Sequence, residues 1–182
     1  MKQRLKTVLD NSVGLTLKPG EVHVTDEPLI IKTLLGSCLS FIMFNKRTKL
    51  TAISHAQLPY EYFNHKCIAN CPVKCNSGAK DNNRSKYVSC STQYMLQQFT
   101  TMGIKKNEIE VKLFGGANVL GFSGEKKTVG EQNIEAAYNI IKENRLNLVS
   151  EDVGGDLGRT IYLYTDSGKV LVKKLEKTKL SG

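Results

Sequence analysis

The sequence has 182 residues, of which 40% are hydrophobic and 24% are charged. This length and composition predict one globular domain, or at most two small ones, and exclude a fibrous or wholly disordered chain. No apolar run approaches the roughly 20 residues needed to cross a bilayer, and the N-terminus lacks the long apolar stretch and cleavage site of a secretory signal. We therefore expect a cytoplasmic protein that is not inserted in a membrane.

The chain is basic, with 26 Lys and Arg against 17 Asp and Glu, a formal net charge of +9. Such a field favours anionic partners, although the same excess could serve only to keep the protein in solution. The sequence contains no long arginine tract, no zinc finger of standard spacing and no aromatic RNA-binding motif. We therefore expect no nucleic-acid partner.

The first half of the chain reads mainly as strands. Residues 1–20 suggest a loosely packed lead-in that ends in a Pro-Gly turn, followed by β-prone runs at 21–25, 29–35, 39–44 and 49–55. The last two runs are joined by a short polar turn, which predicts a β-hairpin. Residues 60–86 are polar and rich in Asn, Lys and Cys, and they are interpreted as a long surface loop inserted in the domain.

Helices and strands alternate in the second half. An apolar stripe from Tyr87 to Met102 predicts a helix that Gly103 ends, and residues 109–114 alternate as a strand does. Thr128 with Glu131 three residues later is the capping box of a second helix. Residues 146–153, 160–164 and 169–175 predict three strands, the last two joined by a turn at 166–168, with a frayed basic tail from Lys173 onward. The predicted fold class is mixed α/β with substantial antiparallel pairing.

The five cysteines are candidates for a functional role. They are Cys38, Cys67, Cys71, Cys75 and Cys90. An odd number of cysteines in a reducing compartment argues against a disulfide framework, so the thiols are catalytic, metal-bound or simply buried. Cys90 has the position of a buried helix residue.

Cys38 lies between two predicted strands, directly after Gly36 and Ser37, and His55 ends the partner strand of the hairpin. If the hairpin forms, the two side chains come to the same end of the sheet. A thiol needs a neighbouring base to become a nucleophile at neutral pH, so the pair is a candidate for nucleophilic catalysis. The spacing alone is a weak signal, because a cysteine in an apolar run is more often a buried small hydrophobe and a lone histidine at a strand end is usually structural.

Several ordered blocks of the sequence resemble the CheD family of chemoreceptor glutamine deamidases. They lie at residues 35–38, 54–59, 112–118, 129–133 and 152–159, and the resemblance closes at the turn 166–168. Together the blocks extend over most of residues 20–175, in the order that the family has. The Gly-rich blocks at 115–116 and 154–158 lack a complete phosphate-binding motif and are interpreted as tight turns with close backbone approach.

The resemblance implies that Cys38 is the nucleophile, that His55 is the general acid and base, and that a threonine just upstream assists them. Thr33 is the nearest candidate for that threonine, with Lys32 as the alternative. Attack of Cys38 on a glutamine side chain would release ammonia and leave a glutamyl thioester, which water then hydrolyses to glutamate. Backbone N–H groups near Gly36, Ser37 and Cys38 are the expected oxyanion hole, and the reaction needs no cofactor.

The resemblance also implies the partners and the fold. The partners would be the cytoplasmic helices of chemoreceptors, whose acidic character suits a basic enzyme, and the phosphatase CheC as a regulator. The fold would be a sandwich of two β-sheets with helices packed outside, in a single CheD-like domain over residues 1–182. A non-catalytic adaptor that binds receptors or CheC is the alternative function.

The inserted loop carries a second candidate site. His65, Cys67, Cys71 and Cys75 offer four ligands suited to zinc or an iron–sulfur cluster, although their spacing is unusual and the family resemblance does not include them. Free surface thiols are the competing interpretation. If the site is real, the protein could instead be a metal-sensing or redox-sensing domain.

Overall fold

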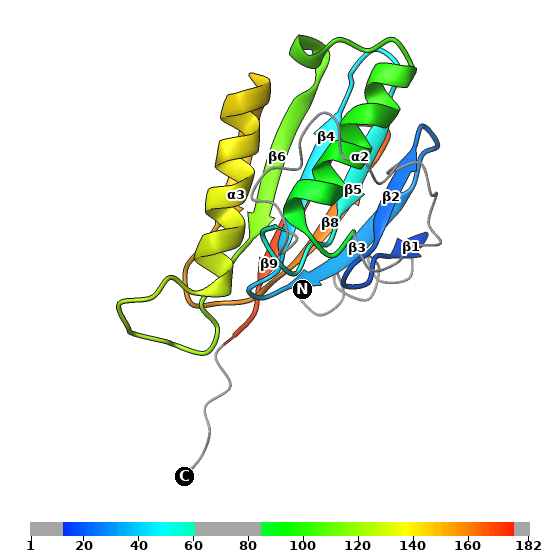
Figure 1. Ribbon diagram of the computed structural model, residues 1–182. Coiled ribbons are helices and arrows are strands. Elements are labelled where there is room, and N and C mark those ends of the chain that lie inside the picture. The colour runs from blue at the N-terminus through cyan, green and yellow to red at the C-terminus, as the bar shows by residue number, and fades with distance from the viewer. Residues whose placement is uncertain (1–12, 61–84, 177–182) are drawn as a thin grey trace.

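A computed structural model of the chain describes residues 13–60 and 85–176 (Figure 1). The strands are β1 (Leu15–Thr16), β2 (Val22–Thr25), β3 (Ile30–Leu35), β4 (Leu39–Phe44), β5 (Thr51–Ser54), β6 (Glu110–Gly115), β7 (Asn147–Val153), β8 (Arg159–Tyr164) and β9 (Lys169–Lys174). The helices are α2 (Val88–Thr101), the short 3-10 helix η1 (Lys106–Glu108) and α3 (Val129–Asn144). Within the described ranges, no helix is long and apolar enough to cross a membrane.

The strands form two sheets, which confirms the predicted mixed α/β sandwich. A five-stranded sheet has the order β2-β5-β4-β6-β7, and a four-stranded sheet has the order β1-β3-β8-β9. Most neighbours are antiparallel, while β6 with β7 and β1 with β3 are parallel. Helices α2 and α3 lie over one face of the five-stranded sheet, and the four-stranded sheet lies behind its other face (Figure 1).

Two apolar clusters hold the three layers together. Side chains of β4, β5 and β6 pack with Met95, Leu96 and Phe99 of α2 and with Ala136 and Ala137 of α3. Ile31 and Leu35 of β3, Ile42 of β4, Ile53 of β5 and Ile161 of β8 form the second cluster, between the sheets. Alternate residues of each central strand therefore point into different clusters, as the period of two in a strand requires.

Most of the predicted elements are confirmed. The hairpin of β4 and β5 forms with Phe44 opposite Thr51, and β8 and β9 form the second hairpin. Helix α3 begins with the predicted capping box, in which the hydroxyl of Thr128 accepts from the amide N–H of Glu131. Cys90 is buried in α2, as expected.

The lead-in prediction is wrong for residues 13–20. Leu15 and Thr16 pair with β3, and Leu17 is buried between the sheets. A two-residue strand is too short to give a periodic signal, so the sequence alone did not reveal it. The prediction of a frayed tail is likewise wrong for Lys173 and Lys174, which belong to β9, and Met102 is exposed rather than part of the apolar stripe of α2.

Gly115 and Gly116 serve close backbone approach, as the sequence indicated. Gly115 has a φ of +108°, and a Cβ atom there would lie 2.2 Å from the carbonyl oxygen of Cys38. The amide N–H of Gly116 donates to that same carbonyl oxygen at 2.8 Å. The Gly-Gly turn at the end of β6 therefore supports the backbone of Cys38 directly.

We expect Gly115→Ala to lower the free energy of unfolding by at least about 2 kcal/mol more than Gly103→Ala does, because an overpacked contact adds to the backbone strain. Gly103 is a matched control, since it also has a positive φ but has nothing within 4 Å of an added Cβ. Urea denaturation of both variants measures the difference. Equal losses would show that the backbone at Gly115 yields without cost.

Candidate active site

The β4–β5 hairpin brings Cys38 and His55 to the same end of the sheet. Leu39 and Ala56 exchange two backbone hydrogen bonds, each 2.8 Å long, and Cys38 directly precedes the first residue while His55 directly precedes the second. The antiparallel register makes Cys38 and His55 diagonal neighbours on one face, for which Cβ atoms are typically about 7 Å apart. That face is the one turned toward the four-stranded sheet, where Cys38 packs beside the second apolar cluster.

Ser54 lies at a gap in the backbone pairing of the β4–β5 hairpin. Its hydroxyl lies 3.4 Å from the amide nitrogen of Phe41 and 3.5 Å from the carbonyl oxygen of the same residue. Ladder pairing is recorded at Leu39–Ala56 and resumes at Ile42–Ile53, with a break between them. The hydroxyl of Ser54 thus replaces a backbone partner in the gap of the ladder, directly before His55.

Thr33 meets His55 from the other sheet. Its Oγ1 lies 2.7 Å from His55 Nδ1 and 2.9 Å from the carbonyl oxygen of Leu17. Lys32, the alternative for the family threonine, lies on the opposite face of β3, with its Nζ 5.7 Å from the ring centroid of Tyr162. The structure therefore brings Thr33, and not Lys32, to the candidate site.

These contacts assign the proton positions on His55. The Leu17 carbonyl can only accept, so the single hydroxyl proton of Thr33 points to it, and the oxygen of Thr33 accepts from His55 Nδ1–H. Nε2 then carries a lone pair. It is buried and has no hydrogen-bond partner among the described residues. The ring is held through Nδ1 and presents an unoccupied basic nitrogen on the face shared with Cys38.

The resting charges of the pair follow from burial. Burial lowers the pKa of His55, against the Leu17 carbonyl and the Glu21 carboxylate, which raise it. Burial raises the pKa of the Cys38 thiol, against its own main-chain N–H, which lowers it. His55 is only 2% exposed, whereas Cys38 is partly accessible. At neutral pH the site therefore holds a neutral thiol that solvent can reach, next to a neutral imidazole that lies deeper.

Main-chain N–H groups lie beside the thiol. The carbonyl oxygens of Gly36 and Cys38 accept from Ala117 and Gly116, which fixes the turn that carries Ser37. Within the described part of the chain, the amides of Ser37 and Cys38 donate to no backbone carbonyl. Neither amide is therefore committed to backbone hydrogen bonding within that part of the chain.

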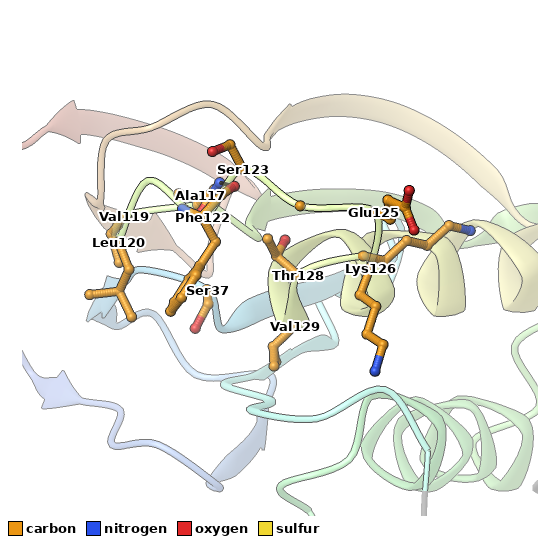
Figure 2. A pocket seen from close by; sticks show the side chains of 13 residues that line it. Ser37, Ala117, Val119, Leu120, Phe122, Ser123, Glu125, Lys126, Thr128 and Val129 are labelled. Atoms are coloured by element: carbon orange, nitrogen blue, oxygen red, sulfur yellow. Dashed lines mark hydrogen bonds between the residues drawn. The ribbon is translucent and has the colours of Figure 1, made fainter.

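An open pocket of about 510 Å³ borders the thiol segment. Ser37 lines this pocket together with residues of the loop between β6 and α3 (Figure 2). Leu120 and Phe122 of this loop are 77% and 69% exposed, and Val119 and Val129 are also exposed. Exposed apolar patches of this kind are typical of surfaces that bind a partner.

Sequence reasoning missed two contributors to the site. Leu17 acts through its backbone carbonyl, which leaves no signal in the type of residue. Glu21 faces His55 across the β2–β5 pairing, where the His55 amide donates to the Glu21 carbonyl at 2.9 Å. The signal that could have found Glu21 is its place at the start of the strand predicted at 21–25.

The predicted metal ligands His65, Cys67, Cys71 and Cys75 fall at residues 61–84, outside the described residues, and the metal site stays a prediction. Among residues 13–60 and 85–176, no group of three His, Cys, Asp or Glu side chains is placed to hold a metal ion. Within the same residues, neither Cys38 nor Cys90 forms a disulfide.

Comparison with known proteins shows the family of this chain. Residues 72–174 match the model of the family described as CheD, chemotactic sensory transduction. The chain belongs to the CheD family. The matched segment contains α2, β6, α3 and β7–β9, while Cys38 and His55 lie before it.

Curated members of the CheD family match nearly the whole chain. A protein of Geobacter sulfurreducens named "probable chemoreceptor glutamine deamidase CheD 2" is 36% identical over 162 residues, which are 89% of this chain and 90% of that protein. A "probable chemoreceptor glutamine deamidase CheD" of Methanococcus maripaludis strain C5 is 36% identical over 160 residues, 88% of this chain and 94% of that protein. One of Thermococcus kodakarensis is 31% identical over 163 residues, 88% and 92% of the two chains.

Proposed function

We propose that this protein is a chemoreceptor glutamine deamidase that converts selected receptor glutamines to glutamate and releases ammonia. The observation that carries the proposal is the state of His55: its ring is held through Nδ1 by Thr33, and its Nε2 has no hydrogen-bond partner among the described residues. The Leu39–Ala56 bridge makes Cys38 its diagonal neighbour on the same face of the sheet. The names of the CheD relatives supply the substrate class.

The first step forms a thioester. His55 Nε2 takes the thiol proton as Sγ attacks the carboxamide carbon of the substrate glutamine, and the carbonyl oxygen becomes an oxyanion. The amides of Ser37 and Cys38 are the donors for that oxyanion; one such donor is typically worth about 10²- to 10³-fold in rate. The imidazolium then gives this proton to the substrate nitrogen, the oxyanion re-forms the C=O bond as the C–N bond breaks, and ammonia leaves.

The second step hydrolyses the thioester. His55 Nε2 removes a proton from water, the oxygen attacks the thioester carbon, and the C–S bond breaks as the proton returns to sulfur. The products are a receptor glutamate and the regenerated thiol. Each transient imidazolium is stabilised by the Leu17 carbonyl and the Glu21 carboxylate, the two groups that raise the pKa of His55.

The pocket beside Ser37 is where we place the receptor segment. The apolar side chains of Leu120 and Phe122 would cover the non-reacting face of a receptor helix. The net charge of +9 would attract an acidic helix before contact. We also propose CheC, the phosphatase that the family resemblance implies, as a regulatory partner.

The direct test is peptide mapping of a chemoreceptor cytoplasmic fragment incubated with the reduced protein. The proposal requires conversion of particular Gln residues to Glu, with one ammonia released for each conversion. A fragment that binds the protein but keeps every Gln would favour the adaptor function instead.

The pH dependence of the reaction follows from the two resting charges. The neutral imidazole must accept a proton, so kcat/KM should rise with pH through the lowered pKa of His55, below about 6.5. It should fall only above the raised pKa of Cys38, where the proton needed by the departing ammonia is lost. Initial rates from about pH 5 to pH 10 test this. An acidic limb above neutrality would contradict the assignment.

Thr33→Val should lower kcat by about 10- to 100-fold, because a group that orients a catalytic ligand typically contributes that much. Valine keeps the branched shape but leaves His55 Nδ1–H without the oxygen that now lies at 2.7 Å. Thr165→Val is the matched control, since Thr165 is a buried threonine whose hydroxyl bonds backbone groups near the other end of β3. Equal kcat values for wild type and Thr33→Val would remove Thr33 from the site.

A further inference from the structure

The two backbone segments of the candidate active site separate after the bridge between Leu39 and Ala56. Up to the bridge between Leu39 and Ala56 they are neighbouring strands. Beyond it, residues 36–38 are bonded to residues 116–117, while the amides of Gln57 and Leu58 both donate to the carbonyl of Lys86. Directly beyond the bridge that adjoins Cys38 and His55, the two segments are thus fixed to different parts of the molecule.

One side chain spans the gap between them. Asn133 of α3 is fully buried, and its Nδ2 donates to the carbonyl oxygen of Ser37 at 3.0 Å and to that of Gln57 at 3.1 Å. Ser37 directly precedes the nucleophile, and Gln57 follows the base by two residues. Among the described residues, no other recorded hydrogen bond joins segment 36–38 to segment 57–58.

The helix that carries Asn133 is held close to the same turn. A Cβ atom on Gly130 would lie 2.4 Å from the carbonyl oxygen of Gly116, and a Cβ atom on Gly116 would lie 2.6 Å from Ile134. The absence of side chains at both glycines lets the first turns of α3 rest on the backbone that also supports Cys38. The amide of Asn133 is therefore placed by packing rather than by its own rotamer freedom.

We propose that Asn133 is a positioning residue for the deamidation reaction, which rests on the proposed function. Its amide donates to both segments and, together with the Leu39–Ala56 bridge, fixes how far Cys38 lies from His55. A primary amide suits this place because one nitrogen supplies two N–H donors that point in different directions. Alanine supplies neither donor, and a displacement of about 1 Å between reacting groups can cost roughly 10²-fold in rate.

The test compares Asn133→Ala with Asn45→Ala. Asn45 is also buried, and its Nδ2 donates to the carbonyl of Glu108 at 2.9 Å at the far end of β4, so it controls for the loss of a buried amide. Two quantities are measured at a temperature where near-ultraviolet circular dichroism shows each variant folded. They are kcat and KM on a receptor fragment, and the pH profile of Cys38 alkylation by iodoacetamide, followed by mass spectrometry of the Cys38 peptide.

We expect Asn133→Ala to lower kcat by about 10- to 100-fold with little change in KM, and to move Cys38 alkylation to higher pH because the thiol loses its base. Asn45→Ala should leave both unchanged. If Asn133→Ala does not fold, Asn133→Ser, which keeps one donor, is judged by the same criteria.

An unchanged alkylation profile and kcat in a folded Asn133 variant, or equal changes in the Asn45 variant, would overturn the proposal. The alkylation measurement needs no receptor, so failure of this inference is distinguishable from failure of the proposed deamidase function. If wild-type protein deamidates no receptor, the alkylation profile still reports whether Asn133 sets the thiol beside its base.

Discussion

Cys38→Ala is expected to lower the deamidation rate of a receptor fragment by about 10⁴-fold or more, the scale on which loss of a catalytic nucleophile acts. Without the thiol no thioester forms, and a carboxamide is a poor target for water alone. Binding should survive, because the apolar pocket is lined by Ser37 and the β6–α3 loop and not by Cys38. The measurement is the rate of ammonia release, together with an affinity measurement on the same fragment.

Cys90→Ala provides the control for this substitution. Cys90 is the other cysteine that the structure describes, and it is buried in α2. We expect Cys90→Ala to keep its activity. If Cys38→Ala retained deamidation at more than about one per cent of the wild-type rate, a different nucleophile would be responsible.

His55→Gln is expected to lower kcat by about 10³- to 10⁴-fold, because the same ring must act as base and as acid in both halves of the reaction. Burial holds the His55 ring neutral at rest, since it lowers the pKa of this group. Glutamine can still bond Thr33 but cannot carry a proton between sulfur and the departing nitrogen. The acidic limb of the pH profile should disappear together with the rate.

His23→Gln is the matched variant for His55→Gln. His23 lies in β2 opposite Ile53, and its Nε2 is also buried without a hydrogen-bond partner in the described part of the chain. It has no recorded bond to Thr33, so its loss should leave kcat within about threefold. A loss of rate in His23→Gln as large as in His55→Gln would mean that both act through packing.

The position of Cys38 and His55 followed from the sequence because it depends on local structure. Two β-prone runs joined by a short polar turn form a hairpin, and antiparallel pairing brings the start of one strand to the end of the other. The same reasoning gave the capping box of α3 and the glycine turn after β6. In each case the residues that determine the outcome lie close together in the chain.

The contacts that orient the site are not local, and the sequence did not reveal them. Thr33 lies in the other sheet, 22 positions from His55, and nothing in the spacing distinguished it from Lys32 until the face of β3 was known. Leu17 contributes a backbone carbonyl from a strand of two residues. Asn133 bonds residues 96 and 76 positions away. Such pairings depend on how the layers stack, which propensity and periodicity do not specify.

Each layer of the fold contributes different residues to the candidate site. In the proposed mechanism, the hairpin of the five-stranded sheet supplies the nucleophile and the base, and the four-stranded sheet supplies the threonine that orients the base. Helix α3 packs on the other face of the five-stranded sheet, and its Asn133 donates a hydrogen bond to the carbonyl oxygen of Ser37. A change that shifts one layer relative to another is therefore expected to affect rate before it affects folding.

Hydroxylamine capture tests the central claim most directly, because the account requires a glutamyl thioester on Cys38. Hydroxylamine attacks a thioester to give a hydroxamate on the receptor and returns the cysteine thiol. We predict that wild-type protein, incubated with a receptor fragment and hydroxylamine, yields glutamyl hydroxamate at the positions otherwise converted to Glu, and that Cys38→Ala yields none. Conversion to Glu that continues in Cys38→Ala, with no hydroxamate from either protein, would contradict the thioester mechanism.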